Sequence, residues 1–468
     1  MRHKPSIAHT ALGPDFYDAV EPARFPALTL RHRDQRAAAR VGLDGLTDAE
    51  WLAHFGRFEP LPGSLEQPLA LRYHGHQFRH YNPDLGDGRG FLFAQLHDLH
   101  DGRLLDLGTK GSGTTPWSRS GDGRLTLKGG VRELLATSML EALGVNTSKT
   151  FSLIETGERL ERQDEPSPTR AAVMVRLNHS HIRIGSFQRL AYLDQPENVL
   201  RLLDYTIRTY MPAVWHDDVA VRAAAFVAEV AGRCARLGAA WMAAGFVHGV
   251  LNTDNINVTG ESFDYGPWRF LPHYDPQFTA AYFDHGGLYA YARQPDTLLW
   301  NLVRLAECLL PLADKESLQA AIETFSPAFH AAQDAALLRR LGLVSMGREQ
   351  DHALGGAWWR MLEETRTPFE QAFFDAYANR DPRRATRFPQ AVAEAWAPVQ
   401  DILDTYAPAP EATVDHPYFA APGPCTMLIE DVEALWTPIA DRDDWQPLAA
   451  KLASIEVMRQ AYGGAAIA

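Results

Sequence analysis

The segment that most constrains the fold of this chain is residues 246–267, with the sequence FVHGVLNTDNINVTGESFDYGP. It follows an alanine-rich stretch with helical periodicity at residues 219–244. A polar loop, a short β-branched run at residues 256–258 and a turn at Gly260 come next. An apolar step then leads into Asp264. This order predicts a long helix, a loop, a short strand at 256–258, a turn and an acidic residue.

Kinase-like folds use the same order of elements to place two metal-binding residues under a nucleoside triphosphate. Protein kinases write the first part as H-R-D-x-x-x-x-N and the second as D-F-G. In this chain an H-G pair at 248–249 fits the start, Asn255 fits the metal-binding Asn, and D-Y-G at 264–266 fits D-F-G. Val250 stands where the catalytic Asp would be, and a carboxylate comes only four residues later, as Asp254. Asn255 and Asp264 offer the hard oxygen ligands that Mg²⁺ prefers.

Two charged residues fit a pair that orients phosphates. Lys110 ends the second strand of a predicted hairpin, and Glu133 lies 23 residues later in a predicted amphipathic helix at 131–143. A strand Lys paired with a helix Glu performs this task in kinase folds. Taken in isolation, a solvated lysine and a surface glutamate are the commoner interpretation.

Two G-D-G-R tetrapeptides, at 86–89 and 121–124, could form glycine-rich turns whose backbone approaches a phosphate. Such tetrapeptides are more often plain hairpin turns. Arg176 and Arg183 end a predicted strand and the loop after it, where guanidinium groups could hold phosphate oxygens. Either arginine alone is more often part of a structural salt bridge.

Composition excludes some functions. The chain has 468 residues and a formal net charge of −13, which argues against nucleic-acid binding because phosphate binding needs a basic face. Its three cysteines are far apart and fit no zinc or disulfide spacing, and no run of 18 apolar residues occurs. We therefore expect a soluble, cytoplasmic protein that binds neither nucleic acid nor membranes.

The order of the predicted elements indicates an α+β molecule with two lobes, because strands dominate up to about residue 176 and helices dominate from residue 196. We expect an N-terminal wrap at residues 1–60 and a strand-rich, kinase-like N-lobe at 61–190. A helical C-lobe with the catalytic loop follows at 191–345, and a helical C-terminal extension at 346–468.

Together these motifs resemble the selenoprotein O family, which are kinase-fold protein adenylyltransferases. The resemblance covers most of the chain, and its most specific parts are HGVLNTDN at 248–255 and DYGP at 264–267. GHQF at 75–78, SRSGDGR at 118–124 and SHIR at 180–183 also match. Family members commonly carry a Cys or selenocysteine near the C-terminus, and this chain does not, so a thiol switch of that kind is not expected.

The resemblance implies transfer of AMP from ATP to Ser, Thr or Tyr hydroxyls of proteins, with release of pyrophosphate. ATP would bind reversed relative to kinases, and UTP with Mn²⁺ could replace it. Asp254 would be the proton acceptor, and Asn255 and Asp264 would hold Mg²⁺ or Mn²⁺. The residues expected around ATP are Gly86, Gly88, Arg89, Lys110, Asp122, Gly123, Glu133, Arg176, Arg183 and Asp264.

Two other functions remain open from the residues alone. A kinase-like enzyme could move the γ-phosphate, because Asp254 would serve that reaction as well. A catalytically silent ATP-binding scaffold is the second, although an intact Asn255 and Asp264 pair argues against it. The expected partners are ATP and substrate proteins, and the chain is expected to be a monomer.

Overall fold

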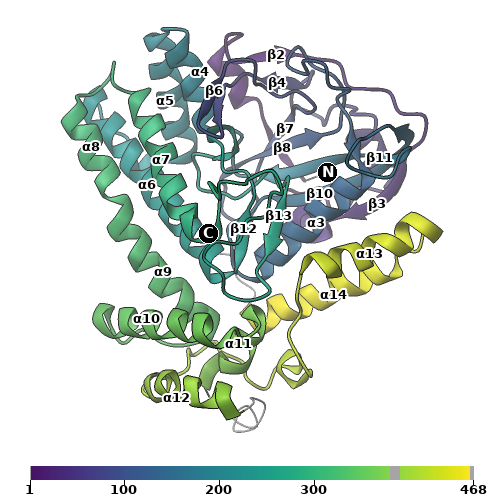
Figure 1. Ribbon diagram of the computed structural model, residues 1–468. Coiled ribbons are helices and arrows are strands. Elements are labelled where there is room, and N and C mark those ends of the chain that lie inside the picture. The colour runs from purple at the N-terminus through teal and green to yellow at the C-terminus, as the bar shows by residue number, and fades with distance from the viewer. Residues whose placement is uncertain (1, 380–389, 464–468) are drawn as a thin grey trace.

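The computed structural model describes residues 2–379 and 390–463. They form a mixed α/β structure around a nine-stranded sheet whose strand pairs are antiparallel (Figure 1). The strand order is β2-β4-β7-β8-β11-β10-β3, with β1 beside β7 and β9 beside β11. The strands are β1 (Lys4–Ser6), β2 (Tyr17–Ala19), β3 (Thr29–Arg33), β4 (Leu69–Leu71), β7 (Leu92–His97), β8 (Leu104–Lys110), β9 (Leu125–Thr126), β10 (Lys149–Leu160) and β11 (Thr169–Asn178).

The first 60 residues contribute three of these strands and two helices, α1 (Gln35–Arg40) and α2 (Asp48–Phe55). Thr47, predicted as the N-cap of α2, forms a capping box with Glu50. The side chain of Trp51 is fully buried and stacks on Phe151 of β10, with ring centroids 4.9 Å apart. The N-terminal segment is therefore packed into the sheet.

The predicted hairpin is confirmed as β7 and β8, which pair from Leu92 to His97. All seven residues of β8 are buried, so its last residue, Lys110, lies inside the molecule. Helix α3 (Leu127–Ala142) confirms the predicted amphipathic helix and packs on β10 and β11. Its N-cap Thr126 accepts a hydrogen bond from the backbone of Gly129.

The second half of the described chain is mainly helical, as expected. Helix α6 runs through its centre and packs against α7, α8 and α9 (Figure 1). The helices around it are α4 (Ile184–Tyr192), α5 (Pro196–Tyr210), α6 (Val219–Ala243), α7 (Gln294–Glu307), α8 (Lys315–Glu323) and α9 (Phe325–Leu341). Those that follow are α10 (Arg348–Thr365), α11 (Phe369–Ala376), α12 (Gln390–Leu403), α13 (Ile429–Arg442) and α14 (Gln446–Ala461).

The last two helices return to the sheet, where α14 and α13 lie beside α3 (Figure 1). Asp443, which follows α13, pairs with Arg170 of β11 at 2.6 Å and with Arg31 of β3 at 3.1 Å. These contacts fasten the C-terminal helices to the part of the molecule that carries Lys110 and α3.

The prediction of a strand at 256–258 is wrong. Only Asn257 forms an isolated bridge, to Arg183, while Ile256 and Val258 are buried in the core. A strand forms instead at β12 (Phe246–His248), which pairs with β13 (Trp268–Phe270). A three-residue segment with two β-branched apolar side chains, Ile256 and Val258, fits a strand or a buried loop equally well, and here core packing decides.

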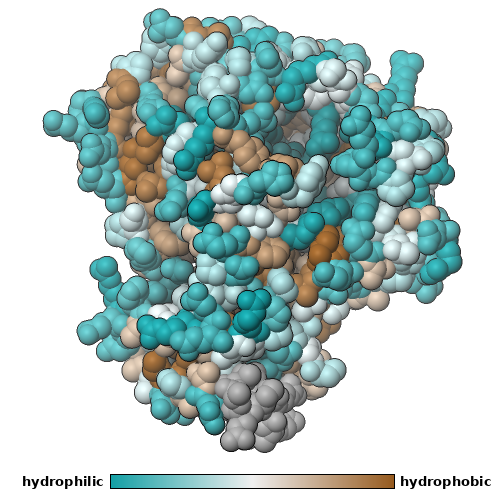
Figure 2. Space-filling model, viewed as in Figure 1, coloured by the Kyte–Doolittle hydropathy of each residue, from teal (hydrophilic) through white to brown (hydrophobic). Residues whose placement is uncertain are grey.

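The surface is ordinary for a globular protein. On the face shown in Figure 2, hydrophilic residues predominate and hydrophobic ones gather only in small, separate groups. Within residues 2–379 and 390–463, no helix combines the length and the apolar character needed to cross a bilayer. The three cysteines are unpaired and buried.

Candidate active site

The loop after α6 is held by the β12–β13 ladder. The chain leaves α6 through Gly245, whose φ of +62° suits glycine, and enters β12. The backbone N–H of Gly249 donates to the carbonyl of Pro267 at 2.8 Å. The two motifs recognised in the sequence, 248–255 and 264–267, therefore lie side by side. A short 3₁₀ turn at Thr253–Asn255 carries the predicted catalytic residues.

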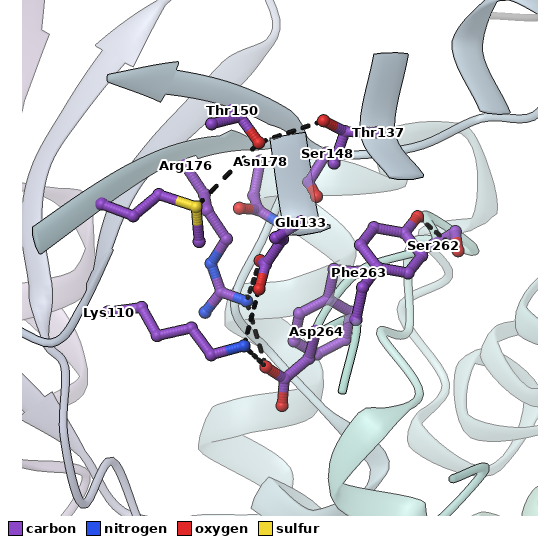
Figure 3. A network of polar contacts seen from close by, with 12 residues as sticks. Lys110, Glu133, Thr137, Ser148, Thr150, Arg176, Asn178, Ser262, Phe263 and Asp264 are labelled. Carbon is purple, nitrogen blue, oxygen red and sulfur yellow. Dashed lines mark hydrogen bonds and ion pairs between the residues drawn. The ribbon is translucent and has the colours of Figure 1, made fainter. Parts of the chain in front are cut away.

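Lys110, Glu133 and Asp264 form a buried ion-pair cluster (Figure 3). Lys110 Nζ lies 2.6 Å from Glu133 Oε2 and 2.9 Å from Asp264 Oδ1. The side chains of Lys110 and Glu133 are only 7% and 1% exposed. The commoner interpretation of these two residues as solvated surface groups is therefore wrong, because β8 and α3 carry them into the interior.

Arg176 of β11 joins this cluster. Its Nη1 lies 3.4 Å from Glu133 Oε1 and 3.3 Å from Asp264 Oδ1 (Figure 3). Burial raises the pKa of Asp264, but the charges of Lys110, Arg176 and Arg183 outweigh burial and hold this pKa well below its usual value. Asp264 is therefore an anion, and its side chain remains 27% exposed on the solvent side of the cluster.

Arg183 connects the glycine-rich turn to the catalytic loop. Its Nη2 lies 3.2 Å from Asp87 Oδ1, and its Nη1 donates to the backbone carbonyl of Asp254 at 3.2 Å. The guanidinium carbon also lies over the rings of Tyr73 and Phe263, at 4.2 and 5.1 Å from their centroids. The sequence predicted Arg183 as a phosphate ligand. It did not indicate that Arg183 bridges Asp87 and Asp254.

Asp254 is buried and carries a carboxylate oxygen without a protein partner. Its Oδ1 has no hydrogen bond among the described residues. Burial raises the pKa of Asp254 to about 7, with Arg183 opposing and Asp264 adding to this shift. Gly75 lies against the carboxylate so closely that a Cβ there would come within 2.9 Å of Oδ1. A carboxyl group in this state can accept a proton near neutral pH.

A small hairpin, β5 (Gly75–Gln77) and β6 (His80–Asn82), orients the catalytic loop. The backbone N–H of His76 donates to Thr253 Oγ1 at 2.7 Å. The N–H of Phe78 donates to Asn252 Oδ1 at 3.1 Å. Sequence reasoning noted G-H-Q-F only as part of a resemblance, and nothing in its periodicity indicates this contact.

Next to Asp254 lies a cavity of about 620 Å³, large enough for a nucleotide. Its walls include Asp254 and five residues predicted to contact ATP, namely Gly86, Gly88, Arg89, Asp122 and Gly123. Gly86 packs against Trp117, where a Cβ would lie 2.4 Å from the indole. Arg119 also lines the cavity and was missed by sequence reasoning.

The cations around this cavity differ in their availability. Arg124 is paired with Glu158 at 2.9 Å, and Arg162 is paired with Asp122 at 2.9 Å. The exposed side chains of Arg89 and Arg119 have no hydrogen bond or ion pair to any residue that the structure describes. These two guanidinium groups are free to meet an anion.

Asn255 and Asp264 have the chemistry for a divalent metal ion. Asn255 Nδ2 donates to the carbonyl of Val250 at 3.0 Å, which turns the amide so that its oxygen remains available. The hydrogen bonds that the Asp264 side chain accepts within the described residues all go to Oδ1, which leaves Oδ2. Two hard oxygen donors, with phosphate and water completing the shell, suit Mg²⁺ or Mn²⁺.

The predicted site residues thus fall into two neighbouring groups. Lys110, Glu133, Arg176 and Asp264 form the ion-pair cluster, and the glycine-rich segments with Asp254 form the cavity. Arg183 lies between them, since its charge lowers the pKa of both Asp254 and Asp264.

Comparison with known proteins assigns the chain to a family. The family described as "Protein adenylyltransferase SelO" matches residues 1–456. The chain is 44% identical to "Protein nucleotidyltransferase YdiU" of Synechococcus elongatus, over 97% of this chain and 94% of the relative. The protein of the same name from Trichormus variabilis is 41% identical, over 97% and 96%. That from Gloeobacter violaceus is 44% identical, over 96% and 93%.

A nucleotide-sized cavity beside a buried carboxylate and a cluster of cations fits an enzyme that transfers part of a nucleotide, and the relatives are nucleotidyltransferases by name. The chain belongs to the protein adenylyltransferase SelO family. The sequence-based predictions of this family and of a nucleotidyltransferase are confirmed.

Proposed function

We propose that the chain transfers AMP from ATP to hydroxyl groups of substrate proteins, with Asp254 as the proton acceptor. The observation that carries this proposal is the position of Asp254: a buried carboxylate, one oxygen of which lacks a partner, in the wall of the 620 Å³ cavity. The names of the family and of its relatives indicate a protein acceptor.

The reaction would proceed by one displacement. The acceptor oxygen forms a bond to the α-phosphorus, and its proton passes to Asp254. The bond from the α-phosphorus to the oxygen bridging to the β-phosphate breaks, and pyrophosphate leaves. Reactions of this kind depend mainly on positioning and on charge stabilisation. General-base help contributes about 10²- to 10⁴-fold.

The cations would hold the phosphates. The positions of Lys110 and Arg176 suit the β- and γ-phosphates of ATP bound in the reversed orientation that the family resemblance implies. Asn255 and Asp264 would hold Mg²⁺ or Mn²⁺, which when bound neutralises phosphate charge. Arg89 has no competing partner, so it can contact the nucleotide without breaking an ion pair.

The architecture is part of the same proposal. A kinase-like, two-lobed arrangement, with the N-lobe at 61–190 and the C-lobe at 191–345, is supported by the central position of α6 and by the Lys110–Glu133 pair. Residues 1–60 and 346–468 would wrap and extend these lobes. ATP is the proposed donor, UTP with Mn²⁺ a further one, and we propose that a monomer suffices for activity.

Label transfer tests the proposal. Purified protein is incubated with a mixture of candidate substrate proteins and with ATP labelled at either the α- or the γ-phosphate. We expect acceptor labelling from the α-phosphate only, and none with the Asp264→Ala variant. Labelling from the γ-phosphate would identify a phosphotransferase instead. Thermal stabilisation by ATP with no labelled acceptor from either position would identify a silent scaffold.

A further inference from the structure

A second cavity, separate from the nucleotide-sized one, has a volume of about 200 Å³ and a cationic lining. Five separate parts of the chain meet there: the turn before β8, the loop before β10, the segment after β11, helix α6, and the turn at Gly260. The lining residues are Arg103, Asn146, His179, Arg233, Arg236, Leu237, Ala240, Thr259 and Gly260. Three of the nine are arginines, and none is a carboxylate.

The carboxylates that pair with Arg103 and Arg233 contact them at Nε, and Nη2 of Arg233 also donates to the carbonyl of Tyr210 at 3.5 Å. Asp101 contacts Arg103 at Nε, at 3.2 Å, and Glu229 accepts from Arg233 Nε at 2.7 Å. The exposed Arg236 has no ion pair or hydrogen bond with any residue that the structure describes. Arg233 and Arg236 are three residues apart on α6 and so lie on one face, where like charges repel. An anion between them would relieve this repulsion.

The uncharged lining is able to donate as well. Burial lowers the pKa of His179 to about 3, and the charges of Arg103 and Arg233 add to this shift, so its ring is neutral and carries one N–H. No hydrogen bond of this ring to another described residue is found, while its backbone N–H donates to Glu261. Asn146 uses one amide hydrogen, toward the carbonyl of Gly260 at 3.3 Å, and keeps the other.

From this lining we propose that the cavity is a binding site for a small phosphate anion of about the size of pyrophosphate. The volume is several times the roughly 30 Å³ that one water molecule occupies in the liquid, so it exceeds the needs of a halide ion. A guanidinium group can donate two parallel hydrogen bonds to a pair of phosphate oxygens, and arginines from two parts of the chain line this cavity. The site is built from side chains that the proposed transfer reaction does not use, so it does not depend on that proposal.

The position of the site connects it with the catalytic residues. His179 lies four residues before Arg183, which bridges Asp87 and Asp254, and Gly260 lies four residues before Asp264. An anion held at this site would therefore restrain both segments at once. The phosphate could come from free pyrophosphate or from the phosphate tail of a nucleotide.

Titration calorimetry with pyrophosphate tests the site. The proteins compared are the wild type, the double variant Arg233→Gln/Arg236→Gln, and the control Arg348→Gln, which removes an exposed arginine on α10 that has no partner among the described residues. A fourth protein, Arg89→Gln/Arg119→Gln, weakens binding in the nucleotide cavity. Folding of each variant is checked by its thermal midpoint without ligand.

We expect one class of pyrophosphate sites to weaken by about tenfold or more in Arg233→Gln/Arg236→Gln and to remain unchanged in the control and in Arg89→Gln/Arg119→Gln. Crystals soaked with tungstate would show density between the three arginines. Binding equal to wild type in Arg233→Gln/Arg236→Gln would overturn the proposal. So would binding that vanishes altogether in Arg89→Gln/Arg119→Gln. Displacement of pyrophosphate by ATP at this site would identify a nucleotide as its source, and no displacement would identify the free anion.

Discussion

The ion-pair cluster and the nucleotide-sized cavity lie next to each other and differ in how their charges are used. In the cluster, Lys110 and Arg176 are bound by Glu133 and Asp264. In the cavity, Arg89 and one oxygen of Asp254 have no partner among the described residues. Arg89 in the cavity can therefore bind an anionic ligand directly. In the cluster, Lys110 and Arg176 must first give up a carboxylate partner before they can bind a phosphate.

This difference suggests that the cluster and the cavity bind different parts of the nucleotide. Buried ion pairs recover their desolvation cost only while both partners are present. Glu133 holds Lys110 in place, and under the proposed function Lys110 would turn toward ATP when Asp264 binds a metal ion. The open cavity needs no such exchange and can take the rest of the nucleotide first.

The largest expected effect is that of Asp254→Asn, which removes the proposed proton acceptor from the cavity wall. Since general-base help is worth about 10²- to 10⁴-fold, we expect kcat for AMP transfer to fall by that factor with little change in nucleotide affinity. Steady-state assays and calorimetric binding of ATP measure the two quantities. Asp84→Asn, an exposed control, should leave both unchanged. Full activity in Asp254→Asn would assign the proton to another group.

Lys110→Met tests whether the cluster is a closed network. Removing one partner of a buried pair leaves Glu133 and Asp264 less compensated, so we expect the free energy of unfolding to fall by about 3–5 kcal/mol. Lys110→Met/Glu133→Leu should recover part of this loss in urea unfolding, without recovering activity. A single variant as stable as the wild type would mean that the cluster is not a network of buried pairs.

Glu261→Gln tests a second buried carboxylate whose pKa, like that of Asp254, is raised by burial. Glu261 accepts from Asn178 and from the backbone of His179, and burial raises its pKa from 4.5 to about 7, against the weaker opposing effect of these bonds and of Lys149 and Arg103. Its folded pKa is above the unfolded one, so the folded protein binds more protons between pH 4.5 and 7 and stability falls as pH rises through this window.

The loss over that window amounts to about 3 kcal/mol. We expect Glu261→Gln to flatten the pH dependence of the free energy of unfolding by this amount, measured by urea titrations at several pH values. A curve that stays parallel to the wild type would show that Glu261 ionises as an ordinary exposed carboxylate.

Arg89→Gln should have the smallest effect and a selective one. Because Arg89 is exposed and unpaired, we expect stability to change by less than about 0.5 kcal/mol while the KM for ATP rises several-fold. Arg124→Gln is the matched control, since its guanidinium is already bound by Glu158. Equal effects of the two substitutions on KM would remove the distinction between free and paired cations.

Sequence patterns predicted the pairs that depend on regular elements. The strand before Lys110 and the helix around Glu133 follow from periodicity, and their meeting follows from the kinase-like order. The contact of Gly75 with Asp254 and the bridge from Arg183 to Asp87 were not predictable, because they join short segments about 100 to 180 residues apart that have no periodic signal. The wrong prediction of a strand at 256–258 has the same cause, because this short segment also has no periodic signal.

The most direct test is a crystal structure of the protein with a non-hydrolysable ATP analogue and Mn²⁺. The proposed reaction requires the metal between Asn255 and Asp264, Lys110 turned from Asp264 to phosphate, and the α-phosphorus as the phosphorus closest to Asp254. A γ-phosphorus closest to Asp254, or an analogue bound outside this cavity, would contradict it.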